Sequence, residues 1–275
     1  MKKILVPCNF SDCAQSAVKL AIELADAYGA KIVLLTVLQT PAKATSDDDV
    51  QELTADDVKH NFQKLLEAHH SHKQLISHEI HWGRLVPAIL QQINEQKIDI
   101  VVMGSQGSRG WEDFFLGSNT EKVVKTSPIP VFSVKTQTTF ASIKNIVVPC
   151  DFKLNKRDFI SQVKELQKMF GAKIHLLRIN TNKKIDDNKV YAELEKYARY
   201  YELPHATFHT RFDENETDGI VHFAKEINAD LIAMSTSGNS NPEHWYYNSI
   251  AGDVVNHTTK IVWTWRTKNM HALYS

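Results

Sequence analysis

The sequence predicts an α/β protein built from two tandem open sheets, each mostly parallel, five-stranded and covered by helices on both faces. Three observations lead to this prediction. The 275-residue chain contains an internal repeat. Each copy alternates short apolar runs rich in β-branched residues with stretches of helical periodicity, the order that forms parallel sheets with crossover helices. The apolar fraction of 43% is sufficient for two hydrophobic cores.

The repeat can be read directly from the sequence. The segment KILVPCNF at residues 3–10 recurs as NIVVPCDF at residues 145–152, and GAKIVLL at 29–35 recurs as GAKIHLL at 171–177. Later segments match at a smaller offset, as DIVVM at 99–103 and DLIAM at 230–234 do. The second copy has therefore lost residues, and we place the loss near the loop at 42–50. The expected domains are 1–138 and 142–268, joined by a short polar linker around 136–144.

The elements of the first copy follow from local signals. Ile4–Pro7 predicts a short apolar strand, and Ser11 can cap a helix that ends at Gly29, where a left-handed residue is favoured. The continuous apolar run Ile98–Met103 is typical of a strand buried in a parallel sheet. Further strands are expected at 31–38, 76–82 and 131–134, and helices near 54–69, at 85–95 and from about Ser118. The second copy repeats this order.

Charge and composition exclude several classes of protein. The 32 Lys and Arg residues balance the 32 Asp and Glu residues, which argues against nucleic acid or a polybasic membrane surface as a partner. The first apolar run stops at Pro7, too early for a signal peptide, and no run reaches the ~18 residues of a membrane span. Three cysteines are too few for a disulfide framework. We expect a cytoplasmic protein.

A glycine-rich loop follows the strand that ends at Met103. Its pattern is Gly104-x2-Gly107-x9-Gly117-Ser118, with Ser118 opening a helix. Glycines let a backbone approach an anion, and the N–H groups at a helix N-terminus bind phosphate. The loop also lies at the carboxyl end of a central strand, where open α/β sheets bind ligands. Glycine spacing alone is equally compatible with tight turns and a simple helix cap, and the pattern is neither a P-loop nor GxGxxG.

With its opening segment at residues 4–11, this loop spacing resembles the ATP-binding members of the universal stress protein family, over nearly the whole chain as two fused copies. The resemblance implies a Rossmann-like fold, similar to the adenine-nucleotide alpha-hydrolases. It also implies a site for ATP or another adenine nucleotide, with Mg²⁺ as an optional companion. Its contact residues would lie after the first strand, at the end of the second strand and around the loop: Pro7, Asn9, Val37, Met103, Gly104, Gly107, Gly117, Ser118 and Asn119.

The two copies depart from the family pattern in different ways. Asn9 stands where the family usually has an acid on the ribose, so the stronger charge-assisted hydrogen bond is lost there. In the second copy Asp151 restores the acid, but the loop reads Ser235-x2-Gly238-x9-Asn248-Ser249 and gains bulky residues at 244–247. We therefore expect nucleotide binding in the first copy and a degenerate loop in the second.

The resemblance also implies pairing of the two domains, because family dimers form through the last strand. Trp263 and Trp265 share one face of that strand, which is equally compatible with a core role. The two domains would pair within the chain as a pseudo-dimer, and association of two chains stays open.

Other chemical residues have ordinary interpretations. His69, His70 and His72 cluster at an expected helix end, and we assign them no metal. His205 and His209 are expected on one strand face as solvated side chains. Cys8 and Cys150 are expected as buried thiols.

The sequence shows no catalytic constellation. Glu112 and Asp113 in the loop are compatible with holding a cation and equally with being ordinary solvated loop acids. The expected function is nucleotide-dependent binding or signalling in a stress response. Two alternatives remain open: an interaction scaffold that needs no nucleotide, and a slow ATP hydrolase.

Overall fold

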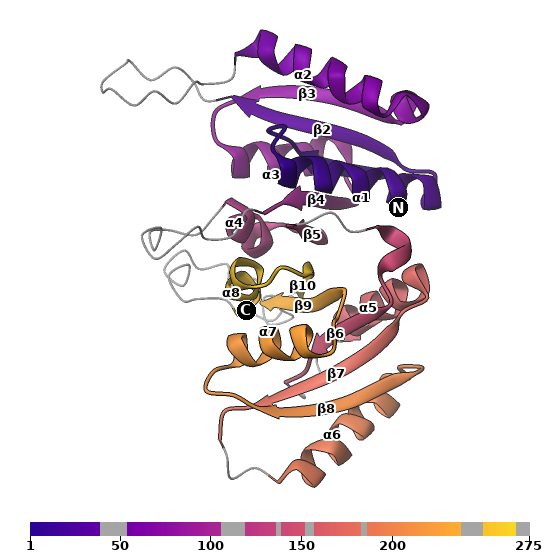
Figure 1. The fold of residues 1–275 in the computed structure, drawn as a ribbon, viewed down its shortest axis with the longest axis vertical. Helices are drawn as coiled ribbons and strands as arrows, with labels where there is room; N and C mark the ends of the chain where they lie inside the picture. The colour runs from indigo at the N-terminus through magenta and orange to yellow at the C-terminus, as the bar shows by residue number, and fades with distance from the viewer. Residues whose placement is uncertain are drawn as a thin grey trace, which may run out of the picture.

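The predicted alternation of strands and helices is present in both copies of the computed structural model, which describes residues 1–38, 54–105, 119–135, 139–151, 157–182, 186–237 and 250–267. Figure 1 shows the first copy in indigo to magenta and the second in pink through orange to yellow. The first copy contains β1 (Lys3–Pro7), α1 (Asp12–Tyr28), β2 (Lys31–Leu38), α2 (Ala55–Ala68), β3 (Ile76–Trp82), α3 (Leu85–Gln96), β4 (Ile100–Gly104), α4 (Asn119–Thr126) and β5 (Val131–Val134).

The second copy repeats this order. It contains β6 (Asn145–Pro149), α5 (Arg157–Phe170), β7 (Lys173–Asn180), α6 (Asp187–Tyr200), β8 (Ala206–Phe212), α7 (Glu216–Glu226), β9 (Leu231–Ser237), α8 (Ile250–His257) and β10 (Ile261–Thr267). Residues 39–54 separate β2 from α2, whereas only residues 181–186 separate β7 from α6. The second copy is therefore shorter between its second strand and the following helix, where the change of offset predicts the loss.

The α/β class is confirmed, but the prediction of two separate sheets is wrong. All ten strands form one sheet in the order β3-β2-β1-β4-β5-β10-β9-β6-β7-β8. The pairs within each copy are parallel, while β5 and β10 pair antiparallel at the centre (Figure 1). Each copy alone would leave its last strand as a sheet edge with unpaired backbone groups, and the antiparallel pairing satisfies both edges at once.

Helices cover both faces of this sheet, and the two cores run through both copies. One core packs α1, α2, α5 and α6 on the face that carries Ile4, Val6, Phe132 and Trp263. The other packs α3, α4, α7 and α8 on the face that carries Leu5, Met103 and Val262. Side chains alternate between faces along each strand, so the continuous apolar runs of the central strands supply both cores.

Side-chain caps fix the boundaries of α1 and the start of α2. The Ser11 hydroxyl accepts a hydrogen bond from the Ala14 N–H and caps α1, and Gly29 ends that helix with a left-handed φ of 63°. Thr54 and Asp57 form a reciprocal capping box at the start of α2. The caps of α1 match the sequence signals at Ser11 and Gly29.

The segment that connects the two copies contacts both of them through Phe140. Phe140 lies in a short 3₁₀ turn (Phe140–Ser142), and its N–H donates to the Glu23 carboxylate of α1. The Phe140 ring packs against Phe170 of α5, with 4.9 Å between the ring centroids. Within the described ranges, no helix is both long and apolar enough to cross a membrane.

Candidate functional site

The first copy brings the ends of three neighbouring strands together at one edge of the sheet. β1 lies between β2 and β4, and Pro7 is in register with Leu35. The Cys8 N–H donates to the Leu35 carbonyl at 2.9 Å, which extends the pairing past the end of β1. Met103 and Gly104 end β4 on the other side of β1. This carboxyl edge is where parallel α/β sheets bind ligands.

The turn after β1 is fixed by hydrogen bonds between Asn9 and Ser11. The Asn9 Oδ1 atom accepts from the Ser11 N–H at 3.3 Å and from the Ser11 hydroxyl at 2.7 Å. The Asn9 side chain is exposed, and its Nδ2 group makes no hydrogen bond to the described residues. Because the oxygen of this amide is engaged in the turn, the NH₂ group is the part that can meet a ligand.

Phe10 gives the same turn an unusual backbone. Its φ of 61° is left-handed, which is rare for a bulky residue. The Phe10 ring packs edge-on against His78 at 6.3 Å, and His78 stacks on Phe62 at 4.5 Å. These aromatic contacts hold the turn at the carboxyl edge of the sheet.

A hydroxyl on β2 supports the backbone of this turn. The buried Thr36 hydroxyl donates to the Cys8 carbonyl at 2.8 Å and lies 3.1 Å from the His78 Nε2 atom. Since the Thr36 proton goes to the carbonyl, the His78 Nε2–H donates to Thr36. Burial raises the pKa of the Cys8 thiol to about 11, so this thiol is neutral and acts as a small apolar group.

Gly104 ends β4 directly beneath the first turn of α1. A Cβ atom there would lie 2.5 Å from the Cys13 carbonyl carbon and 2.8 Å from the Ala14 nitrogen. The Thr120 hydroxyl of α4 lies 3.4 Å from the Gly104 carbonyl, so the beginnings of α1 and α4 both meet this residue. Gly104 is therefore required by packing, whether or not a ligand binds.

Ser105 is the last described residue before the predicted loop. Its N–H donates to the Val134 carbonyl at 2.8 Å, and its side chain is buried. The Ser105 hydroxyl finds no hydrogen-bond partner among the described residues. Thr236, at the equivalent place in the second copy, is also buried with an unpartnered hydroxyl in the described part of the chain. Both copies thus keep a buried hydroxyl just before the segment for which the sequence predicts the loop.

The predicted site residues fall into three groups. Pro7, Asn9, Val37, Met103 and Gly104 lie at the carboxyl edge described above. Asn119 is the first residue of α4 and is exposed. The remaining predicted residues, together with the acids of the loop, lie outside the described residues: Gly107, Glu112, Asp113, Gly117 and Ser118.

Two of the predicted residues contribute backbone rather than side chain at this edge. Met103 is buried in the core between the sheet and α3 and α4, and Val37 packs half-buried against the same core. Their side chains support the edge from below. The groups that these residues offer to a ligand are therefore their backbone N–H and C=O groups.

The second copy has a different edge. Arg178 stands at the position equivalent to Thr36, and its guanidinium donates to the Cys150 carbonyl at 3.3 Å. It therefore makes the hydrogen bond that the Thr36 hydroxyl makes to the Cys8 carbonyl in the first copy. Asp151 is partly exposed, and Ser235 stands at the position of Gly104. Gly238, the bulky residues 244–247, Asn248 and Ser249 lie outside the described residues.

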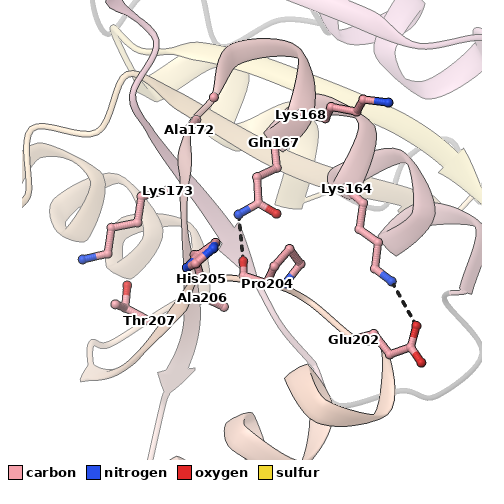
Figure 2. Close-up of a pocket in the computed structure, with 11 residues that line it drawn as sticks. Lys164, Gln167, Lys168, Ala172, Lys173, Glu202, Pro204, His205, Ala206 and Thr207 are labelled. Atoms are coloured by element: carbon pink, nitrogen blue, oxygen red, sulfur yellow. Dashed lines mark hydrogen bonds and ion pairs between the residues drawn. The ribbon is translucent and has the colours of Figure 1, made fainter.

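A hollow of about 870 Å³ lies at the opposite, amino-terminal edge of the second copy, between α5 and the starts of β7 and β8. Figure 2 shows that the side chains of Lys168 and Lys173 extend away from one another, while Lys164 reaches toward Glu202. Gln167 donates to the Pro204 carbonyl at 2.8 Å across the floor. Because its charged groups diverge, this hollow lacks the convergent polar groups of a binding site.

Two of the histidines noted in the sequence, His72 and His209, make side-chain contacts in the structure. His72 lies 3.0 Å from Asp26 and forms an ion pair when protonated. The expectation that His209 is solvated is wrong, because α7 covers that face of β8 and the ring packs 4.8 Å from Phe223. The His209 Nε2 atom lies 3.2 Å from the His175 Nδ1 atom. His205 precedes β8 with a left-handed φ of 51° and is not on the strand.

Two cations beside the seam, Lys135 just after β5 and Arg266 in β10, were not singled out by the sequence analysis. The Lys135 ammonium donates to the Asn256 carbonyl at 2.7 Å, and the Arg266 guanidinium donates to the Thr126 carbonyl at 3.3 Å. Each cation therefore binds a carbonyl at the end of the other copy's helix. Burial lowers the pKa of Lys135 to about 8. The sequence signal for this arrangement is that Lys135 and Arg266 are two cations at equivalent positions of the two copies.

A comparison with protein families gives a match in both copies. The model described as the universal stress protein family matches residues 1–135 and again residues 142–266. The chain is similar to Universal stress protein MJ0531 of Methanocaldococcus jannaschii, with 32% identity over 139 residues that cover 49% of this chain and 82% of the relative. A Thermus aquaticus protein, named a universal stress protein in the QAH/OAS sulfhydrylase 3′ region, is 29% identical and covers 49% of this chain and 98% of its own length.

Solved structures show the same fold over nearly the whole chain. A universal stress protein from Archaeoglobus fulgidus has a TM-score of 0.71 at 19% identity and covers 97% of both chains. A protein of unknown function from Pseudomonas aeruginosa, PA1789, has a TM-score of 0.67 at 14% identity and covers 97% of this chain and 92% of its own. The two-copy arrangement of strands and helices is therefore shared with these proteins.

Proposed function

Because this chain belongs to the universal stress protein family, we propose that its first copy binds ATP or another adenine nucleotide at the carboxyl edge of β1, β2 and β4. The observation that carries the proposal is the meeting of the Asn9 turn, the end of β2 and Gly104 at one edge, beside the start of α4. Polar groups and backbone amides at such an edge suit a nucleoside with its phosphates.

In the proposed complex each predicted residue has a role. Pro7 and Asn9 contact the nucleoside, the Val37 backbone contacts adenine, and Met103 and Gly104 form the floor. Gly107, Gly117, Ser118 and Asn119 hold the phosphates, with Mg²⁺ as their natural companion. Since the Asn9 oxygen is engaged by Ser11, its NH₂ group donates to a ribose oxygen.

The second copy is proposed to have lost triphosphate binding, because Ser235 and Asn248 replace glycines of the loop pattern. The proposed domains are 1–138 and 142–268. Their joining through β5 and β10 is interpreted as an intramolecular pseudo-dimer. The proposed role is a nucleotide-dependent binding or regulatory protein of the cytoplasmic stress response.

The experiment that tests this function is identification of the bound ligand. The purified protein is denatured, and released small molecules are separated by chromatography and identified by mass spectrometry. One equivalent of ATP, ADP or AMP per chain supports one competent copy, and two equivalents contradict the proposed loss in the second. If no nucleotide is released and added ATP gives no calorimetric heat, the scaffold alternative replaces this proposal. Conversion of added ATP to ADP would favour the hydrolase alternative.

A further inference from the structure

The seam between the copies, where β5 pairs with β10, has an internal symmetry that two residues reveal. Phe132 of β5 is in register with Trp263 of β10. These residues occupy the same place in the two copies, because β5 follows α4 as β10 follows α8. A residue that faces its own counterpart marks a two-fold axis between two similar bodies.

Matched hydrogen bonds in the turns before these strands support the equivalence. The Ser127 hydroxyl accepts from the Ile129 N–H at 3.3 Å in the first copy, and the Thr258 hydroxyl accepts from the Lys260 N–H at 3.2 Å in the second. Both turns lead into the strands that meet at the seam, which fixes the counterparts on the two sides.

The helices above the seam contain a second pair of counterparts, Glu121 of α4 and Gly252 of α8. A Cβ atom on Gly252 would lie 2.7 Å from the Glu121 Cγ atom and 3.2 Å from its Oε1 atom. Glu121 is only 8% exposed. Its carboxylate lies 2.5 Å from the Lys125 ammonium and accepts from the Asn256 amide at 3.1 Å. The glycine of one copy therefore makes room for the buried acid of the other.

We propose that this Glu121–Gly252 pair makes the seam selective, so that a first copy pairs with a second copy and not with another first copy. Two first copies joined in the same way would bring two Glu121 side chains to the axis. The two side chains would compete for the same space, and their two negative charges would repel each other. A buried carboxylate is also costly unless it has its own hydrogen-bond or ion-pair partners. The inference rests on the proposed pseudo-dimer and adds the residues that choose the partner.

The opposite arrangement is disfavoured for a different reason. Two second copies would place Gly252 against Gly252, which removes the buried acid and its hydrogen bonds and leaves a gap. They would also place Trp263 against Trp263, where the structure fits Trp263 beside the smaller Phe132. Only one copy of each kind fills the seam, and a single chain supplies that combination.

A second acidic residue near the axis, Asp253, adds to the selectivity of the seam. Asp253 lies beside Glu121, and its pKa is raised by burial and by the Glu121 charge. The surroundings of the axis thus already hold two acidic groups. A third carboxylate at position 252 would meet both of them.

The test uses the full chain carrying Gly252→Glu, which places two glutamates at the axis. Hydrogen exchange of the β5 and β10 amides, followed by mass spectrometry, should become about tenfold faster or more, and the melting temperature should fall. Ile250→Glu is the matched control, because it adds a carboxylate to the same helix at an exposed position and should leave exchange unchanged. ATP binding is measured separately, so failure here is distinguishable from failure of the proposed function.

The decisive variant swaps the two residues between the copies, by combining Glu121→Gly with Gly252→Glu. Lys125 and Asn256 flank the axis from opposite sides, so the moved glutamate keeps one partner in its own helix and one across the seam. Exchange in this double variant should return toward the wild-type rate. The proposal is overturned if Gly252→Glu exchanges at the wild-type rate, or if the double variant is no better protected than Gly252→Glu alone.

A milder pair of variants covers the case in which Gly252→Glu does not fold. Gly252→Ala adds only the Cβ atom that meets Glu121 Cγ, and it should speed exchange at the seam. Combining it with Glu121→Gly should remove that effect. Equal exchange in Gly252→Ala and in this combination would overturn the proposal.

Discussion

Gly104 at the end of β4 lies directly against the backbone of Cys13 in α1: a Cβ atom on Gly104 would come within 2.6 Å of the Cys13 carbonyl oxygen. The contact joins the floor of the candidate site to the helix that follows the Asn9 turn. Any change in the spacing between β4 and α1 therefore moves two parts of the site at once.

Gly104→Ala should destabilise the protein and weaken nucleotide binding. Its methyl group meets backbone atoms, which cannot rotate away, so we expect a loss of about 1–3 kcal/mol in the free energy of unfolding, the usual range for overpacking. Urea unfolding followed by circular dichroism measures the loss. An alanine variant as stable as wild type would show that α1 and β4 are not tightly spaced.

Thr36→Val should weaken the turn that follows β1. The substitution keeps the shape but leaves the Cys8 carbonyl without the Thr36 hydroxyl, at an expected cost of about 1–3 kcal/mol. ATP affinity should fall as well, because Asn9 follows Cys8. Ser77→Ala is the control, since the Ser77 hydroxyl of β3 donates to the Ile32 carbonyl near the start of β2, at the opposite end from Thr36. Similar loss of ATP affinity in both variants would contradict a local role for Thr36.

Asn9→Asp should strengthen nucleotide binding about threefold to tenfold, because a carboxylate accepts a charge-assisted hydrogen bond from a ribose hydroxyl. Titration calorimetry with ATP measures the change. Asp151→Asn, the reverse change in the second copy, should leave the affinity unaltered. An unchanged or lower affinity in Asn9→Asp would place the ribose away from this residue.

The stability of the protein should fall as the pH is lowered from about 6.5 toward 4. Burial, the His209 charge and the Lys173 charge lower the pKa of His175 to about 4, and burial lowers the pKa of His209 as well. In the unfolded chain these rings titrate near 6.5, so between the two values the unfolded state binds more protons than the folded state. Folding is thereby penalised at about pH 5 by about 2 kcal/mol for His175.

Urea unfolding at about pH 7 and about pH 5 measures this effect. The control is His175→Gln, which removes the titrating ring and should flatten the pH dependence even if it lowers stability at both values. An equal pH slope in wild type and variant would show that His175 is not the responsible group. No measurement is made below about pH 5, because carboxylates such as Asp99, whose pKa is lowered, add their own losses in more acidic solution.

Local signals in the sequence predict much of the fold. The α1 caps at Ser11 and Gly29 and the order of strands in both copies follow from residue type and spacing. The repeat also locates the shortened loop of the second copy. These features depend on neighbours in the sequence, which is why a single sequence reveals them.

The contacts between distant segments could not be predicted in the same way. The Thr36 and Arg178 side chains donate hydrogen bonds to equivalent carbonyls, those of Cys8 and Cys150. One is a hydroxyl and the other a guanidinium, so the sequence repeat does not reveal that they make equivalent hydrogen bonds. The half-buried place of His209 depends on α7 covering β8, and the single sheet depends on the register of β5 with β10. Such contacts are set by tertiary packing rather than by local preference.

A single nucleotide site in the first copy is best tested by titration calorimetry of the full chain with ATP. We predict one site per chain, lost in Gly117→Val, where a side chain blocks the approach of phosphate, and retained in the matched variant Asn248→Val of the second copy. A stoichiometry of two, or ATP binding that survives Gly117→Val unchanged, would contradict a single nucleotide site in the first copy.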